Sequence, residues 1–100
     1  MSVRESGRQD RTATAIRHEY GEDAWVRVKH GDAYATVGDP DIYGCVFGRA
    51  FGFEQKNDEG KLTKIQTYRL KEMERAGAIV AGIRTPDDAL RALKRGLEGR

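Results

Sequence analysis

The strongest constraint on the fold of this sequence is a short apolar segment between two helices that have clear start signals. Residues 78–83 read Ala-Ile-Val-Ala-Gly-Ile, a nearly all-apolar run that is typical of a strand covered on both faces. The helix before it is predicted to begin after Thr63, whose capping-box partner is Gln66, and to end at Gly77. The helix after it is predicted to begin at Thr85-Pro86, because threonine favours the N-cap and proline the first helical position.

The upstream half of the chain predicts one helix and three strands. A helix is expected over residues 5–20, with Gly21 as its C-terminal stop, and a strand over residues 25–29. Residues 42–53 predict two further strands joined by a type II′ turn at Gly48-Arg49. A hairpin followed by a helix and another strand requires a mixed sheet with helices packed on it. The predicted fold class is therefore α/β, with an αβββαβ core, a mixed sheet flanked by helices, and an extra C-terminal helix.

The predicted hairpin brings three charged side chains together. A two-residue turn at Gly48-Arg49 pairs Tyr43 with Glu54 and Asp41 with Lys56. Paired residues share a face of the sheet, and so do residues two apart on a strand. Asp41, Glu54 and Lys56 are therefore expected to converge.

Two carboxylates beside a lysine suit metal-assisted phosphodiester hydrolysis. Mg²⁺ takes oxygen ligands, usually one or two carboxylates together with water and substrate phosphate. Asp41 and Glu54 supply the carboxylates in this interpretation, the backbone carbonyl of Gln55 is a third ligand, and Lys56 holds the attacking water or offsets negative charge on the phosphate. The alternative on spacing alone is an ordinary cross-strand pair of Asp41 and Lys56 on a solvated face.

Composition places the chain among ordinary soluble domains. One hundred residues, 38% hydrophobic and 34% charged, predict a single globular domain over residues 1–100. The formal net charge of +2 does not by itself indicate nucleic acid, and the single cysteine, Cys45, excludes an intramolecular disulfide. No apolar run has the length of a membrane span or of a signal peptide, so a cytoplasmic protein is expected.

Short motifs of this sequence also occur in a recognisable order. They are Glu5-Ser6-x-x-Gln9, Lys29-His30-Gly31 followed by Tyr34, Gly38-x-Pro40-Asp41, Glu54-x-Lys56, Leu62-Thr63-x-x-Gln66 and Arg84-Thr85-x-x-Asp88-Ala89-Leu90. In this order they resemble the VRR-NUC domain, the virus-type replication-repair nuclease branch of the PD-(D/E)XK superfamily. The resemblance covers nearly the whole chain and is closest to the stand-alone type found in phages and bacteria.

The resemblance implies a restriction-endonuclease-like fold and a Mg²⁺- or Mn²⁺-dependent DNA endonuclease. By position, Asp41 and Glu54 would bind the metal and Lys56 would be the catalytic lysine. Gln66 would lie beside the site, and Glu5 would reach the metal through its water shell. Stand-alone members resemble Holliday-junction resolvases that act as homodimers, so a junction-resolving homodimer in a bacterial or phage-infected cell is expected. A flap or nicking nuclease of DNA repair is the alternative.

DNA contact is expected mainly through cations that meet phosphates, so that shape rather than base sequence selects the substrate. The expected DNA-binding residues surround the hairpin and the next helix: Lys29, Tyr34, Arg49, Lys61 and Lys64.

Two residues depart from the family pattern, and two other classes of function remain open. Asp39 and Gln55 stand where the family more often has apolar residues, and Gln55 is expected to cost burial on the opposite sheet face. The chain could instead be a non-catalytic DNA-binding module that kept the fold, or a dimerising accessory protein. Candidates for a dimer interface are Phe47, Phe51, Phe53, Tyr68 and Leu97.

Overall fold

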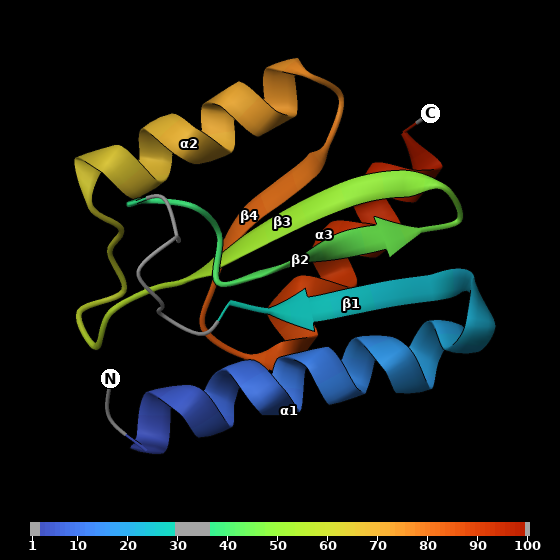
Figure 1. Cartoon of the computed structure of the whole chain (residues 1–100), viewed down its shortest axis with the longest axis horizontal. Coiled ribbons are helices and arrows are strands. Elements are labelled where there is room, and N and C mark those ends of the chain that lie inside the picture. Colours follow the sequence, from blue (N-terminus) through green and yellow to red (C-terminus); the bar gives the residue numbers. More distant parts are fainter. Residues whose placement is uncertain (1–2, 30–36, 100) are drawn as a thin grey trace.

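The computed structural model describes residues 3–29 and 37–99, with side chains from residue 7 onward (Figure 1). The elements follow in the order α1 (Val3–Tyr20), the 3₁₀ turn η1 (Gly21–Asp23), β1 (Ala24–Val28), β2 (Ile42–Val46), β3 (Arg49–Gln55), α2 (Lys64–Arg75), β4 (Ile79–Ile83) and α3 (Pro86–Glu98). The predicted α/β class is confirmed, and so is the predicted order of helices and strands.

The four strands form one mixed sheet in the order β1-β2-β3-β4. β1 pairs with β2 and β2 with β3 in antiparallel fashion, whereas β3 and β4 are parallel. The parallel pair, β3 and β4, is the one joined through α2. Two adjacent parallel strands begin at the same end of the sheet, so the connection must carry the chain back along their length.

Helices pack on both faces of this sheet (Figure 1). On one face, called the core face here, α1 and α3 pack against each other and against the strands. The buried side chains of this core are Ala13, Ile16, Val26, Ile42, Val46, Phe51, Phe53, Ile79, Ile83, Ala89 and Leu93. On the opposite face, called the α2 face, α2 packs over β3 and β4. Gly52 permits this approach, because a Cβ there would lie 2.6 Å from the Met73 side chain of α2.

The predicted helix starts are confirmed. Thr63 and Gln66 form a complete capping box at the start of α2, and Thr85 and Asp88 form another at the start of α3, where Pro86 is the first helical residue. Gly21 adopts a positive φ of 55° directly after α1, as its role as a C-terminal stop predicts.

The predicted hairpin turn is wrong by one position. Val46 pairs with Arg49, so the central turn residues are Phe47 and Gly48 rather than Gly48-Arg49. Both have positive φ, 51° and 76°, as a type I′ turn requires. Tertiary contacts hold Phe47 there, because its N–H donates to the Asp23 carbonyl (2.9 Å) and its ring packs edge-on against Tyr20.

The corrected turn shifts the strand pairing by two residues. Tyr43 therefore lies opposite Gly52 instead of Glu54, and continuing the register places Asp41 opposite Glu54 instead of Lys56. A shift of two keeps every side chain on its predicted face, because side chains alternate with a period of two.

One expectation about the dimer interface is also corrected. Phe51 and Phe53 are buried in the core with their rings stacked, so they are not available for a dimer interface. None of the helices described in Figure 1 is long and apolar enough to cross a membrane.

Candidate active site

A single row of residues crosses the α2 face at one end of the sheet. Lys29 lies beside Asp41, whose carbonyl accepts a hydrogen bond from the Lys29 N–H (2.7 Å), one residue beyond the last paired positions of β1 and β2. Asp41 lies beside Glu54, and its Oδ2 accepts from the neighbouring Gln55 N–H (2.9 Å). Glu54 in turn pairs with Gly82 of β4. The row Lys29–Asp41–Glu54–Gly82 thus runs across the whole sheet, with one residue in or next to each of the four strands.

Glu54 is the most unusual member of this row. Its side chain is only 1% exposed, and its Oε2 is buried with no hydrogen-bond partner among the described residues. Its Oε1 accepts from Gln66 Nε2 (3.0 Å). Burial, together with the neighbouring Asp41 carboxyl group, raises the pKa of Glu54 to about 9; the Lys29 charge and the hydrogen bond from Gln66 oppose the shift. The raised pKa means that Glu54 keeps its proton at neutral pH unless a positive charge offsets its burial.

One lysine lies close to the carboxyl pair, and a second lies across the neighbouring strand. Lys29 Nζ donates to the Asp39 carbonyl (2.7 Å), which anchors its ammonium group near Glu54. Lys56 follows β3, and its N–H donates to the Ile83 carbonyl (2.9 Å). The Lys56 side chain lies across Gly82, because a Cβ on Gly82 would be 3.0 Å from Lys56 Cε. Glycine at this position leaves the space that the lysine side chain occupies.

The carboxyl pair fits a hard divalent cation. Among side chains 7–29 and 37–99, no cluster of three or more His, Cys, Asp and Glu residues could hold a metal ion. Mg²⁺ does not need such a cluster, since it commonly takes one or two carboxylates and completes its shell with water and phosphate oxygens. The unpartnered Glu54 Oε2 beside Asp41 is the observation that favours a cation here.

The other predicted site residues fall into four groups. Gln66 donates to Glu54 and also accepts from the Thr63 N–H to complete the α2 capping box. Its position therefore agrees with both predictions, a place beside the site and a capping role. Lys61 and Lys64 are exposed, near the start of α2. Arg49 lies at the other end of β3, where its guanidinium group donates to the Gly77 and Gly96 carbonyls (2.9 and 3.1 Å) rather than pointing to the site. The Glu5 side chain and residue Tyr34 lie outside the described residues.

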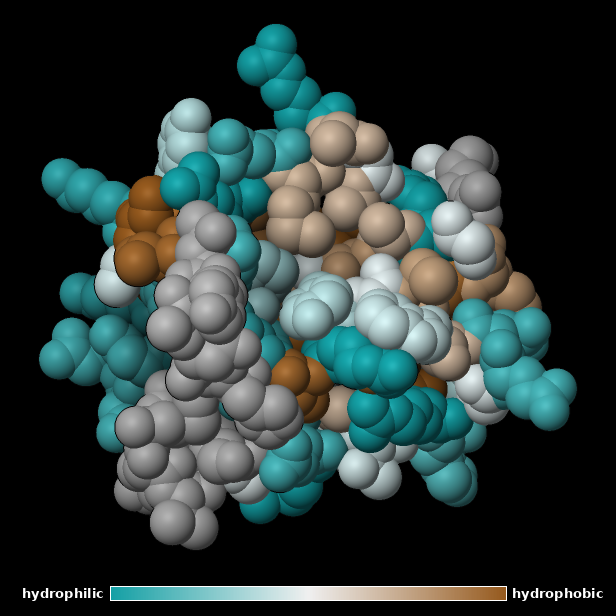
Figure 2. Space-filling model, in the orientation of Figure 1, coloured by the Kyte–Doolittle hydropathy of each residue, from teal (hydrophilic) through white to brown (hydrophobic). Residues whose placement is uncertain are grey.

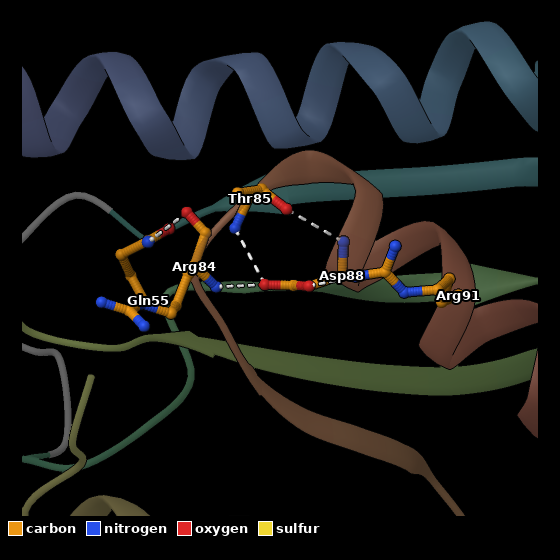
Figure 3. A network of polar contacts seen from close by, with 5 residues as sticks. All are labelled: Gln55, Arg84, Thr85, Asp88 and Arg91. Atoms are coloured by element: carbon orange, nitrogen blue, oxygen red, sulfur yellow. Dashed lines mark hydrogen bonds and ion pairs between the residues drawn. The ribbon is translucent and has the colours of Figure 1, made fainter.

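A polar network fixes the core-face side of the site (Figure 3). Gln55 lies on this face, as predicted, but it is buried rather than costing burial there. Its Nε2 donates to the Arg84 carbonyl at the end of β4 (3.1 Å), while its Oε1 has no partner among the described residues. Asp88 Oδ2 accepts from the N–H groups of Arg84 and Thr85 (2.8 and 3.1 Å), and its other oxygen pairs with Arg91. The Arg84 N–H, followed by the Thr85 N–H and Arg91, lowers the pKa of Asp88. The network ties the start of α3 to the end of β3, next to Glu54.

Sequence reasoning missed a second set of side chains on the α2 face. Trp25 and Tyr43 are 48% and 39% exposed there, and the Arg27 guanidinium lies 4.2 Å from the centre of the Trp25 ring. In Figure 2 the surface over β1 consists mainly of hydrophilic and weakly polar side chains rather than a continuous hydrophobic patch. The alternation in residues 25–29 could have revealed this set, because a buried Val26 sends Trp25, Arg27 and Lys29 to the opposite face.

Comparison with protein-family models and with curated proteins found no match for this chain.

Proposed function

We propose that this protein is a divalent-metal-dependent, structure-selective DNA endonuclease whose site is formed by Asp41, Glu54 and Lys56. The observation that carries the proposal is the buried Glu54 carboxyl, one oxygen of which has no partner among the described residues. Asp41 and Lys29 lie close to it, and Lys56 lies across the adjacent Gly82. An ordinary surface pair does not require a buried acid.

The resemblance to VRR-NUC domains adds to this proposal. The order α1-β1-β2-β3-α2-β4 is compatible with the restriction-endonuclease-like core that the resemblance implies, and the motif residues Asp41, Glu54 and Gln66 meet at one end of the hairpin. The proposed protein is a homodimer that cuts four-way junctions, with a flap or nicking nuclease as the alternative within the same chemistry.

In the proposed mechanism, the Asp41 and Glu54 carboxylates would hold Mg²⁺ or Mn²⁺, with the Gln55 backbone carbonyl as a further ligand. Such an ion lowers the pKa of a bound water and stabilises negative charge on the phosphate. Gln66 keeps the Glu54 carboxyl oriented by donating to its Oε1. Lys56 holds the attacking water or offsets charge on the scissile phosphate, and Lys29 adds positive charge on the other side of the carboxyl pair.

Cleavage of labelled DNA tests the proposal. A four-way junction, a flap and a plain duplex are incubated with the protein and Mg²⁺ or Mn²⁺, with EDTA as the metal-free control. We expect metal-dependent cutting of a branched substrate, reduced about 100-fold or more by Lys56→Ala, which removes a preorganised positive charge. Lys94→Ala, an exposed lysine of α3 on the core side, is the matched control and should cut normally.

Other outcomes reject the nuclease or refine it. Binding of the junction without cutting under any metal condition would leave a DNA-binding module, and neither binding nor cutting would leave a protein that does not act on DNA. Paired symmetric nicks identify a resolvase, whereas a single cut at a flap identifies the alternative.

A further inference from the structure

An exposed aromatic and cationic surface lies on the same sheet face as the carboxyl pair. Trp25 and Tyr43 have ring centres 6.4 Å apart and tilted by 58°, and the Arg27 guanidinium stacks over Trp25. Neighbouring exposed aromatic rings with a guanidinium group over one of them form a suitable surface for stacking a planar ligand. These three residues, Trp25, Arg27 and Tyr43, are called the aromatic platform below.

The charge around the aromatic platform favours a polyanion. Three cations lie at β1 or beside it: Arg17, Arg27 and Lys29. The guanidinium groups of Arg17 and Arg27 both donate to the carbonyl of Val26 (2.8 and 3.0 Å). Neither β1 nor β2 contains an acidic residue. A second copy of the chain docked with the same surface would bring these cations against their equivalents, which like-charge repulsion opposes. Phosphates do not meet this obstacle.

The aromatic platform leads directly to the carboxyl pair. Tyr43 is two residues from Asp41 on the same strand and face, a separation of about 7 Å at the usual rise per residue. Arg27 is opposite Tyr43, and Trp25 lies two residues further from the site. A strand that crosses Trp25 and then Tyr43 therefore arrives at Asp41 and Glu54.

We propose that the aromatic platform binds an unpaired DNA strand by stacking bases on Trp25 and Tyr43 and directs that strand into the Asp41–Glu54 site. Bases of single strands stack on aromatic rings and on arginine planes, whereas the bases of an intact duplex are stacked on one another and cannot. The inference rests on the proposed nuclease for where the strand leads. Of the two proposed substrates it favours the flap, whose branch is unpaired, over the fully paired four-way junction.

Trp25 is the single tryptophan of the chain, so its fluorescence reports directly on stacking. The full-length protein is titrated in EDTA with a short oligothymidylate, with a duplex of equal length, and with an abasic oligonucleotide of equal length and charge. We expect saturable quenching by the oligothymidylate and little quenching by the duplex or the abasic strand. Tyr43→Ala should weaken oligothymidylate binding about tenfold or more, whereas Tyr43→Phe, which keeps the ring, should bind almost as wild type does. Thermal unfolding of both variants confirms that they fold.

Three results would overturn the inference. Equal binding of the abasic strand would show that charge alone acts, and oligothymidylate binding that leaves Trp25 fluorescence unchanged would place the strand elsewhere. A blue shift of Trp25 emission with protein concentration, without DNA and together with dimer formation in sedimentation, would make this face an interface between copies.

The titration is independent of cleavage. Quenching in a protein that cuts no DNA would support strand binding by the aromatic platform and reject the proposed nuclease activity. DNA cleavage by a protein whose Trp25 fluorescence does not respond to single strands would reject strand binding by the aromatic platform and support the nuclease.

Discussion

Glu54 illustrates how a buried acid can mark a site. A carboxyl group in the interior normally finds donors for both oxygens, because an unmet buried acceptor costs on the order of 1–3 kcal/mol. Among the described residues Glu54 meets one donor, Gln66, and a second carboxyl group, that of Asp41, lies close by. Such an arrangement destabilises the empty site and favours any positive charge that can enter it.

The raised pKa of Glu54 predicts an inverted pH dependence of stability. The folded state keeps the proton up to a pKa of about 9, whereas the unfolded chain releases it near 4.5. The folded state therefore binds more protons between these values, and the contribution of Glu54 to the free energy of unfolding falls as pH rises through this window. The unfolding temperature of the metal-free wild type should fall toward pH 9 more steeply than that of Glu54→Gln. Equal slopes in the two proteins, measured by thermal unfolding alongside Glu59→Gln as an exposed control, would contradict this prediction.

The double role of Gln66 predicts that two variants separate stability from site function. Thr63→Ala removes the N-cap and should cost about 1 kcal/mol of stability while leaving Glu54 held. Gln66→Ala removes half of the capping box and the hydrogen bond to Glu54, so it should cost similar stability and additionally weaken Mn²⁺ affinity about tenfold or more. Denaturant unfolding and Mn²⁺ titration measure the two effects. Equal loss of Mn²⁺ affinity in both variants would assign Gln66 a capping role alone.

At the scale of the elements, local signals account for what the sequence predicted correctly. Thr63, Thr85 and Pro86 set the starts of α2 and α3 through caps that depend on adjacent residues only. The hairpin turn was misplaced because a positive φ favours glycine, so Gly48 was expected at the first turn position. Contacts of Phe47 with Asp23 and Tyr20, which are distant in the sequence, decided otherwise.

The candidate site was predictable only in part for the same reason. Asp41, Glu54 and Lys56 were placed on one face because face assignment depends on parity, which survives a shift of two residues. That Lys29 completes the row depends on the pairing of β1 with β2, which no local pattern in the sequence specifies. The contact of Gln66 with Glu54 depends on where α2 packs, which no local pattern specifies.

Close packing of Lys56 on β4 predicts a strong effect of one methyl group. In Gly82→Ala the new Cβ would lie 3.0 Å from both Lys56 Cε and Leu62 Cδ1, so the lysine must move. We expect kcat/KM for DNA cleavage to fall about tenfold or more with a smaller change in unfolding temperature, because a misplaced charge loses its effect on the phosphate. Val80→Ala, on the same strand and face, is the matched control. Normal cleavage by Gly82→Ala would show that the position of Lys56 is not critical.

At the scale of the whole molecule, the two faces of the sheet carry different groups of residues. α1 and α3 cover the core face and α2 lies on the other face (Figure 1). The packed core lies between the sheet and α1 and α3, and the α2 face carries the carboxyl pair and the aromatic platform. Each chain provides one such site. Symmetric cutting of a four-way junction would require two, which a two-fold dimer supplies.

The oligomeric state therefore separates the two proposed substrates. If the protein resolves junctions, sedimentation should show a dimer, and a mixture of wild type with excess Lys56→Ala should accumulate singly nicked junctions because mixed dimers retain one working site. If it cuts flaps as a monomer, the excess variant should leave the pattern of cuts by wild type unchanged. A monomer that still makes paired nicks would contradict the dimer proposal.

The most direct test of the central claim is titration of the DNA-free protein with Mn²⁺, followed by calorimetry in buffers of different ionisation enthalpy. Wild type is predicted to bind Mn²⁺ near neutral pH with release of about one proton, because the cation replaces the proton held by Glu54 and Asp41. Asp41→Asn and Glu54→Gln should each lose this binding, and Lys56→Ala should keep it. Binding that persists unchanged in Glu54→Gln, or that occurs in wild type without proton release, would contradict a metal site at this carboxyl pair.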